Sequence, residues 1–244
     1  MPQVSIIIPT LNEGAYLERT LRCLRNLEPA PLEIIVIDGG SEDNTVDIAL
    51  NAQVKVINTD KAGRSLQMNK GASVAKGEFL CFLHGDTLVP DDLVTLIAQT
   101  LSDSSITGGG FISLMCGQTV TRWTISVHNY LKTYYAPLLF RPYDFFVKGL
   151  RLLFGDQVIF CRKADFEKCG GFDETLPIME DGDLCLKLNR LGRIYLVNRV
   201  VQSSDRRVAK WGVIKASIIY LYIGFLWGFG VKGSYLKRFY QEIR

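Results

Sequence analysis

Two stretches of the 244-residue chain hold side chains whose types and spacing could do chemistry. FLHGDT ends an apolar run with His84 and Asp86, an imidazole and a carboxylate of the kinds that ligate divalent cations. MEDGDLCLKLNRLG gathers Glu180, Asp181 and Asp183 just before an amphipathic run, and one carboxylate there would suffice as a general base. Each stretch has a structural alternative, because a buried strand can end in a polar turn and acidic residues also stabilise the first turn of a helix.

Two further stretches carry charged side chains next to strand-like runs. SSDRRVAKWG places Arg206 and Arg207 after an apolar run, either in a solvated loop or as a cationic clamp, because guanidinium groups match phosphate oxygens. FGDQVIF places Asp156 and Gln157 before another strand, where a turn aspartate is the structural alternative.

Apolar runs of strand length alternate with segments of helical period over about the first hundred residues, which predicts a parallel sheet covered by helices. Ligands of open α/β sheets bind beyond the carboxyl ends of the strands. Polar stretches follow four predicted strands at those ends: PTLNEG, DGGSEDNT, DKAGRS and HGDT. We therefore expect the ligand site there, and we expect Ser41 to cap the helix that follows DGG.

Composition narrows the class of protein. A length of 244 residues with 48% hydrophobic and 22% charged side chains is typical of one globular domain. A net charge of +3, without a basic run before residue 205, does not favour a nucleic-acid partner. Six scattered cysteines and an N-terminus unlike a signal peptide lead us to expect a reducing, cytoplasmic location.

The ordered motifs IIIPTLNEG, IVIDGGSEDNT, KAGRSLQMNKGA, FLHGDT, GDQ, MEDGDLCLKLNRLG and RR resemble those of the family 2 glycosyltransferases, over nearly the whole chain. The resemblance implies a GT-A fold, a Rossmann-like α/β fold with a mostly parallel sheet flanked by helices. It also implies an inverting transfer from a nucleotide-sugar donor, with UDP as the expected nucleotide, that depends on a divalent metal.

The resemblance also assigns roles to individual residues. It implies that Asp181 is the general base, with Glu180 as a neighbour that positions acceptor or base. The nucleotide and donor side would be formed by Pro9, Thr10, Asn12, Glu13, Asp38, Arg64, Asp156, Gln157, Arg206 and Arg207.

The metal motif departs from the family pattern. The family motif is D-x-D, whereas this chain has H-G-D, so that His84 stands in place of the first acid and Asp86 remains as the expected ligand. Because an imidazole replaces a carboxylate, we expect Mn²⁺ to be favoured over Mg²⁺. His84 either ligates the metal or only shapes the turn.

The second half of the chain is less regular. We expect residues 1–212 to form the glycosyltransferase domain, with 1–110 as the nucleotide-binding half and 111–212 as the acceptor and catalytic half. Residues 119–153 suggest helices interrupted by Pro137 and Pro142, in which Trp123, Tyr130, Tyr134 and Tyr135 lie in the core or line an acceptor groove. The acceptor, which the sequence does not identify, could be lipid-linked.

A tail at 213–244 has no charge between Lys215 and Lys232, but its glycines argue against a spanning helix. We expect the tail to pack on the domain, on a partner in a homodimer, or on the inner face of the cell membrane as a peripheral contact.

Two other functions fit parts of the pattern. A nucleotidyltransferase would also use an α/β nucleotide fold, but such an enzyme opens with a glycine-rich loop and PTLNEG has a single glycine. A non-catalytic module that binds sugar nucleotides or membrane surfaces would explain the altered H-G-D.

Overall fold

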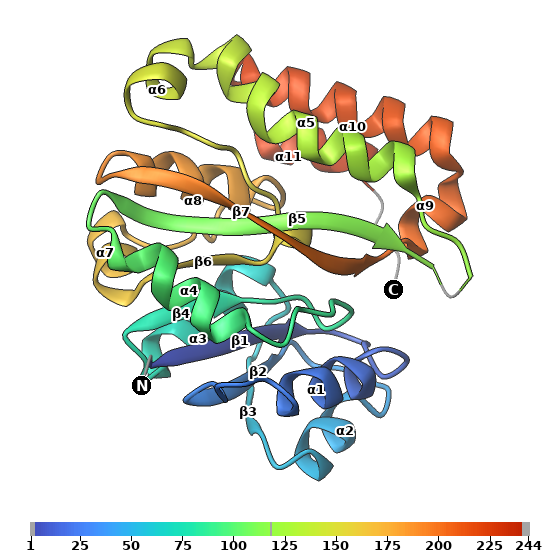
Figure 1. Cartoon of the computed structure of the whole chain (residues 1–244). Coiled ribbons are helices and arrows are strands. Elements are labelled where there is room, and N and C mark those ends of the chain that lie inside the picture. The colour runs from blue at the N-terminus through green and yellow to red at the C-terminus, as the bar shows by residue number, and fades with distance from the viewer. Residues whose placement is uncertain (1–2, 118, 241–244) are drawn as a thin grey trace.

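The computed structural model describes residues 3–117 and 119–240 as one seven-stranded sheet with helices on both faces (Figure 1). The sheet order is β3-β2-β1-β4-β6-β5-β7. The strands are β1 (Val4–Thr10), β2 (Glu33–Asp38), β3 (Lys55–Asn58), β4 (Phe79–Phe82), β5 (Ile106–Cys116), β6 (Ile159–Arg162) and β7 (Arg193–Ser204). Only β6 runs antiparallel to its neighbours in this sheet, which confirms the expected mostly parallel α/β arrangement.

The helices follow the alternation predicted for the first hundred residues and continue beyond it. The α-helices are α1 (Leu17–Arg25), α2 (Thr45–Asn51), α3 (Arg64–Val74), α4 (Leu93–Ser102), α5 (Trp123–Phe140), α6 (Pro142–Val147), α7 (Lys163–Cys169), α8 (Glu180–Asn189), α9 (Arg206–Trp211), α10 (Val213–Gly228) and α11 (Gly233–Leu236). Short 3₁₀ turns span Gly155–Gln157 and Lys237–Phe239.

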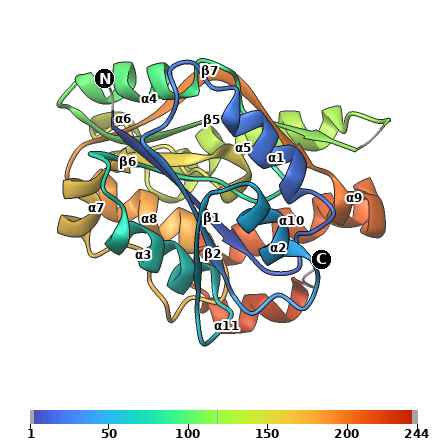
Figure 2. The same ribbon diagram turned by 90° about the horizontal axis from the view of Figure 1, so that it is seen from below.

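The core has two parts, because successive side chains of a strand point to opposite faces of the sheet. Ile6 and Ile8 of β1 pack with α1 and α4, while Ile7 between them packs with α3, α7 and α8. Figure 2 shows these two groups of helices on opposite sides of β1 and β2. The burial of both faces fixes the carboxyl ends of the strands at one edge of the sheet.

The structure corrects two expectations for the second half of the chain. Pro137 lies inside α5, whereas Pro142 begins α6 as predicted. Pro137 lacks the N–H that would bind the carbonyl of Thr133, and the backbone N–H of Leu152 donates to that carbonyl instead, at 3.4 Å. The core interpretation of the aromatic residues is wrong for Trp123 and Tyr130, whose exposed fractions are 66% and 38%.

The tail packs on the protein itself, because α10 lies along α5 and contacts α9 and α11 (Figure 1). The ring centroid of Phe140 in α5 lies 6.0 Å from that of Phe225 and 5.4 Å from that of Phe229. In the part of the chain that the structure describes, no helix combines the length and apolar character needed to span a membrane. The last four residues of the predicted tail, 241–244, lie outside the described residues.

All six cysteines lie in the described residues and are free thiols, as expected from their scattered positions. Cys81, Cys161 and Cys185 are buried in the sheet and in α8. Burial raises the pKa of the Cys81 thiol, and likewise that of Cys185, to about 12.

Candidate functional site

Two adjoining cavities open at the carboxyl ends of the strands, where the sequence places its polar stretches. The larger cavity has a volume of about 720 Å³ and is lined in part by Pro9, Thr10 and Glu13 after β1 and by Arg64 at the start of α3. The inner cavity, of about 170 Å³, reaches further under α5 and α10. Residues that line both are Arg64, His84, Ile178, Glu180, Arg206, Arg207 and Tyr240.

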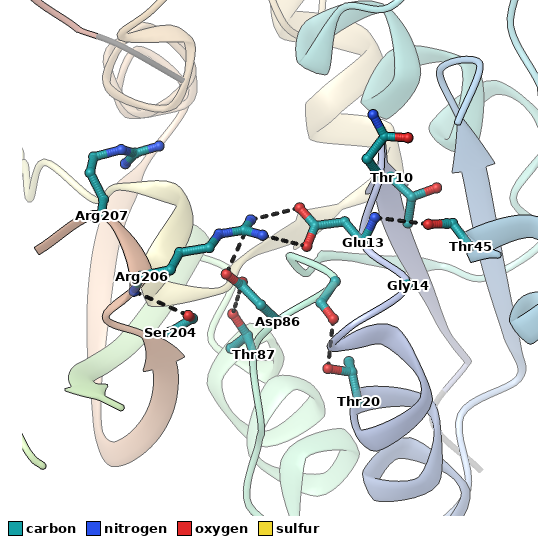
Figure 3. Close-up of polar contacts among 12 residues, drawn as sticks. Thr10, Glu13, Gly14, Thr20, Thr45, Asp86, Thr87, Ser204, Arg206 and Arg207 are labelled. Carbon is teal, nitrogen blue, oxygen red and sulfur yellow. Dashed lines mark hydrogen bonds and ion pairs between the residues drawn. The ribbon is translucent and has the colours of Figure 1, made fainter. Parts of the chain in front are cut away.

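The guanidinium of Arg206 connects three loops across this site (Figure 3). It donates two hydrogen bonds to the carboxylate of Glu13, at 2.8 and 2.6 Å, and lies 3.3 Å from Asp86 Oδ2. The loop after β4 reaches β7 because Leu88 and Gln202 exchange backbone hydrogen bonds of 2.8 Å. This bridge brings Asp86 close to Arg206, the first residue of α9.

Burial controls the protonation of the carboxylates around Arg206. Desolvation raises the pKa of Glu13, and the hydrogen bonds and charge of Arg206 oppose this shift. Burial also raises the pKa of Asp86, with Arg206 again the main opposing influence. Arg206 is therefore the strongest of the influences that favour the ionised form of these two carboxylates.

Asp38, expected to accept from a base or ribose, is 2% exposed and uses its carboxylate within the fold, in its own loop and toward β1. It accepts hydrogen bonds from Thr10 Oγ1 at 3.0 Å, from the backbone N–H groups of Gly40 and Ser41 at 2.9 and 2.7 Å, and from Ser41 Oγ at 2.5 Å. Because a carboxylate has about four acceptor positions, these four donors occupy its capacity. Its contact with a ligand stays a prediction.

Asn12 also joins loops. Its backbone N–H donates to Ser41 Oγ at 2.8 Å, and its side-chain oxygen accepts from the backbone N–H of Glu42 at 2.9 Å. The expected capping by Ser41 is wrong, because α2 begins only at Thr45, after Asn44. Ser41 instead holds the loops after β1 and β2 together.

Glu180 and Asp181 begin α8 and are both buried, at 4% and 8% exposure. Glu180 forms a 2.9 Å ion pair with Arg64, and Asp181 Oδ2 accepts from the backbone N–H of Gly155 at 2.8 Å. Burial and the neighbouring charge of Glu180 raise the pKa of Asp181 to about 7. A carboxylate with such a pKa can exchange a proton near neutral pH, as general base catalysis requires.

The GDQ stretch divides into a cavity residue and a core residue. Asp156 lines the inner cavity and accepts from Asn129 Nδ2 at 2.9 Å. Gln157 is fully buried and donates to the carbonyl of Phe111 at 3.3 Å and to Thr133 Oγ1 at 3.1 Å. Asp156 is thus placed to meet a ligand, whereas the amide of Gln157 is used within the fold.

His84 lines both cavities, and its ring lies against the backbone of Gly155. A Cβ added to Gly155 would lie 2.4 Å from His84 Nε2 and 2.9 Å from Asp181 Oδ2, so only glycine fits between them. Burial and the charges of Arg64, Arg206 and Arg207 lower the pKa of His84 well below its ordinary value. The imidazole is therefore neutral, and the lone pair of one ring nitrogen is available to a metal.

The residues at the site fit a divalent cation only in part. In residues 3–117 and 119–240 no group of three or more His, Cys, Asp or Glu side chains is arranged to hold a metal. Asp86 and His84 offer two ligands of the kinds that suit Mn²⁺, and a diphosphate would add oxygen ligands. The donor set therefore fits a cation that binds together with a diphosphate and is shared with it.

Two polar residues, Tyr240 and Asn129, are among the residues of the inner cavity that sequence reasoning missed. Tyr240 lies in the predicted tail, yet its hydroxyl accepts a hydrogen bond from Arg207, whose guanidinium lies 4.3 Å from the centroid of its ring. Asn129 carries the amide that binds Asp156. Asn129 could have been suspected as a polar residue in an apolar helix, but nothing in the sequence links Tyr240 to Arg207.

Comparison with known families and proteins gives one consistent result. The family model described as glycosyl transferase family 2 matches residues 5–166. A GalNAc(5)-diNAcBac-PP-undecaprenol beta-1,3-glucosyltransferase of Campylobacter jejuni is 34% identical over 115 residues, which are 44% of this chain and 36% of that protein. The chain spans about a third of the length of the curated relatives matched first.

Solved structures share the fold. A mannosyltransferase of Pyrobaculum calidifontis, in complex with GDP-Man and Mn²⁺, aligns with a TM-score of 0.71 at 19% identity over 94% of this chain and 63% of that one. Glucosyl-3-phosphoglycerate synthase of Mycobacterium tuberculosis, in complex with Mn²⁺, UDP and glucosyl-3-phosphoglycerate, aligns with a TM-score of 0.62 at 21% identity over 94% and 81%. The GT-A fold expected from the motifs is confirmed.

We predict that Arg206→Ala lowers the free energy of unfolding by on the order of 3 kcal/mol at pH 8, because it leaves buried carboxylates without their cation. Burial already raises the pKa of Glu13 and Asp86, and removing Arg206 raises both further. At pH 5 the variant can protonate them, so its loss relative to the wild type should be smaller. Urea unfolding at both pH values measures this difference.

Lys210→Ala is the matched control, since it removes an exposed cation from the same helix. It should change the free energy of unfolding by less than about 0.5 kcal/mol. A loss for Arg206→Ala that is equal at pH 8 and pH 5 would contradict the role assigned to the two carboxylates.

Proposed function

We propose that the chain, which belongs to glycosyl transferase family 2, transfers a hexosyl group from a nucleoside diphosphate donor to an acceptor oxygen with inversion. A UDP-sugar is the expected donor. The acceptor oxygen belongs to a hydroxyl or to another group. The observation that carries this proposal is the placement of Asp181. A buried carboxylate whose pKa is raised to about 7 lies in the same cavity as Asp86, Arg206 and Arg207. The site thus offers a base beside groups that suit a diphosphate.

The larger cavity is the proposed donor site. Its volume of about 720 Å³ lies within the 300–1,000 Å³ that is common for small-molecule sites. Pro9, Thr10, Glu13 and Arg64 form part of its wall, and the arginines at its border with the inner cavity are placed for phosphate oxygens. UDP as the nucleotide is supported by its presence in the similar glucosyl-3-phosphoglycerate synthase.

Asp86 and His84 would hold Mn²⁺, or less favourably Mg²⁺, together with the diphosphate. When bound, the cation would neutralise the charge of the diphosphate and polarise its oxygens. Arg206 already neutralises Asp86 when the donor is absent, so the protein alone should bind the cation weakly.

In the proposed reaction Asp181 takes the proton of the acceptor oxygen while that oxygen attacks the anomeric carbon from the face opposite the diphosphate. The bond between the anomeric carbon and the diphosphate oxygen breaks, and its electron pair stays on the leaving nucleoside diphosphate. Arg206 and Arg207 would turn toward this oxygen and offset its charge. Because burial raises the pKa of Glu13, this carboxyl can bind a proton when Arg206 leaves it.

A nucleotidyltransferase is distinguished by its product. The proposed reaction releases a free nucleoside diphosphate, whereas nucleotidyl transfer releases pyrophosphate. A non-catalytic module would release neither from a donor with any divalent metal.

The exposed side of α5 and α10 supports peripheral contact with the inner face of the cell membrane. Both helices lack Asp and Glu, and each carries one lysine, Lys132 and Lys215. Figure 1 shows the pair side by side in the layer farthest from β3. The exposed apolar side chains on this layer are Trp123, Val127, Tyr130, Leu131, Leu138, Leu139, Ile214, Ile218, Leu221, Tyr222 and Phe225. An apolar, acid-free surface suits an anionic lipid interface.

We predict that Asp181→Asn lowers turnover by about 10²–10⁴-fold while UDP binding survives, because the carboxylate acts on the acceptor proton. The base works when deprotonated, so wild-type kcat should fall as the pH drops below about 7. This fall should be absent from the residual activity of the variant. Rates at pH 5.5–8.5 and calorimetric titration with UDP measure both effects.

Asp165→Asn is the matched control, since Asp165 lies in the first turn of α7, away from the cavities, and pairs with Arg162 at 3.1 Å. It should retain most of the turnover. Equal losses for the two variants would assign Asp181 to helix capping, and lost UDP binding would place it in the donor site.

We predict that UDP with Mn²⁺ raises the melting temperature more than UDP and Mn²⁺ do separately, because Asp86 and His84 supply only part of the coordination. Asp86→Asn should remove most of this joint effect, since the amide lacks the charge that holds the cation. Asp91→Asn, an exposed change near the same loop, should preserve it. A full joint effect in Asp86→Asn would exclude Asp86 as the ligand.

We predict that the protein sediments with vesicles of phosphatidylglycerol and phosphatidylcholine and binds at least tenfold more weakly after Ile214→Glu with Ile218→Glu. These residues are 79% and 61% exposed on α10, so the change adds negative charge to the proposed contact surface with little effect on the core. Leu50→Glu is the control, since Leu50 is 56% exposed on α2. Equal binding by all variants would contradict this surface, and concentration-dependent dimers lost in the double variant would assign it to a homodimer.

A further inference from the structure

A third cavity, of about 490 Å³, lies between α5, α10 and the start of α8, and we name it the α5–α10 cavity. Its walls are mainly apolar. They include Leu139 and Phe140 of α5, Leu152 after α6, and Leu221, Phe225 and Trp227 of α10. Leu139, Leu221 and Phe225 are also exposed, at 66%, 49% and 56%, so the cavity reaches the apolar outer layer described above.

The α5–α10 cavity adjoins the inner cavity that contains Asp181. Five residues line both: Lys132, Phe154, Met179, Tyr220 and Gly224. A mainly apolar space therefore leads from the outer layer of α5 and α10 to the edge of the catalytic site. Four charged residues line other parts of its wall: Arg141, Asp173, Asp183 and Lys232.

The glycines of α10 show that this junction is open. A Cβ added to Gly228 would lie 2.6 Å from the ring of Phe140, so glycine is needed there for the close approach of α5. A Cβ added to Gly224 would meet no atom within 4 Å. A helical glycine costs about 0.5–1 kcal/mol relative to alanine, and packing explains this cost at Gly228 but not at Gly224. The absence of a side chain at Gly224 keeps the passage between the cavities free.

Lys132 supplies positive charge at the same junction. Its Nζ lies 3.6 Å from the centroid of the Phe154 ring, and within residues 3–117 and 119–240 no carboxylate lies at ion-pair distance from it. Burial lowers the pKa of Lys132 to about 8, and the charge of Asp156 opposes this shift. The ammonium is therefore placed where an anionic head would pass from the apolar to the polar cavity.

We propose that the α5–α10 cavity holds the hydrocarbon chain of an amphiphilic acceptor, whose anionic head passes Lys132 into the inner cavity beside Asp181. The proposal rests on the proposed function and names the class of acceptor. The apolar cavity joins a surface suited to lipid with a site suited to an acceptor oxygen. It can therefore hold the hydrocarbon chain of such a molecule while the head reaches the site.

The test uses alkyl phosphates below their micellar concentration as probes of the chain. Trp227 lines the cavity, so 12-bromododecyl phosphate should quench its fluorescence saturably, because bromine quenches indole at contact. Bromoethyl phosphate, which has the head but no chain, should not quench. Unbrominated chains should compete, with affinity rising about two- to fourfold per methylene from hexyl to decyl phosphate.

Two variants at position 224 distinguish the effect of filling the junction from an effect on the stability of the fold. Gly224→Leu should weaken quenching at least tenfold, because its side chain fills the junction. Gly224→Ala should bind nearly as the wild type does and should not lower the melting temperature. Trp227→Phe should remove the saturable quenching, which would show that the quenched indole is that of Trp227.

Leu221→Glu provides a second variant if Gly224→Leu does not fold by circular dichroism. Leu221 is half-exposed at the rim, so the charge should leave the fold intact and weaken binding of the chain. Absence of saturable quenching in the wild type, or undiminished quenching in the folded variants, would overturn the proposal.

Binding of UDP with Mn²⁺ to the wild type, measured alongside, separates the two levels of inference. If the donor binds but the alkyl phosphates do not, only the proposal of an amphiphilic acceptor is overturned. Absence of donor binding would remove the proposed function itself, whatever the alkyl phosphates do.

Discussion

The site depends on one partly buried cation shared by two carboxylates whose side chains are largely buried. Arg206 stands at the end of β7 and bonds to Glu13 after β1 and to Asp86 after β4, so three strand ends have one electrostatic partner. An unpaired charge in such surroundings costs several kcal/mol, which makes the three loops interdependent. The bridge between Leu88 and Gln202 sets the distance at which this pairing is possible.

Two other carboxylates of the site also have partners. Glu180 pairs with Arg64. Asp181 accepts a hydrogen bond from a backbone N–H instead of pairing with a cation, and its pKa is raised. In the site without a donor, Arg64 and Arg206 are therefore already paired with carboxylates, and a diphosphate adds negative charge that these two arginines do not offset. This imbalance is the physical reason to expect a cation that arrives with the donor, and it leaves Asp181 as the carboxylate free to accept a proton.

The sequence predicted the parts of the structure that depend on local pattern. The alternation of apolar runs placed β1, β2 and β4 correctly, and polar residues at strand ends such as Thr10 line the cavity because parallel strands end at one edge. The pairing of Glu13 with Arg206 joins residues 193 positions apart, which no local pattern encodes. Asp38 illustrates a different problem. Its place at a strand end predicts a ligand group, but the sequence does not reveal that four donors within the protein already bind its carboxylate.

The buried thiols can report transient local unfolding of the protein through their reaction with an alkylating reagent. Cys81 lies in the central strand β4 and Cys185 in α8, and a pKa of about 12 keeps both protonated and unreactive at neutral pH. A thiol becomes a nucleophile only as the thiolate, so alkylation of these two residues has to follow exposure of the sheet or of α8. Rates of alkylation at each cysteine would compare the opening of the central sheet at β4 with that of the helix that carries Asp181, without an introduced label.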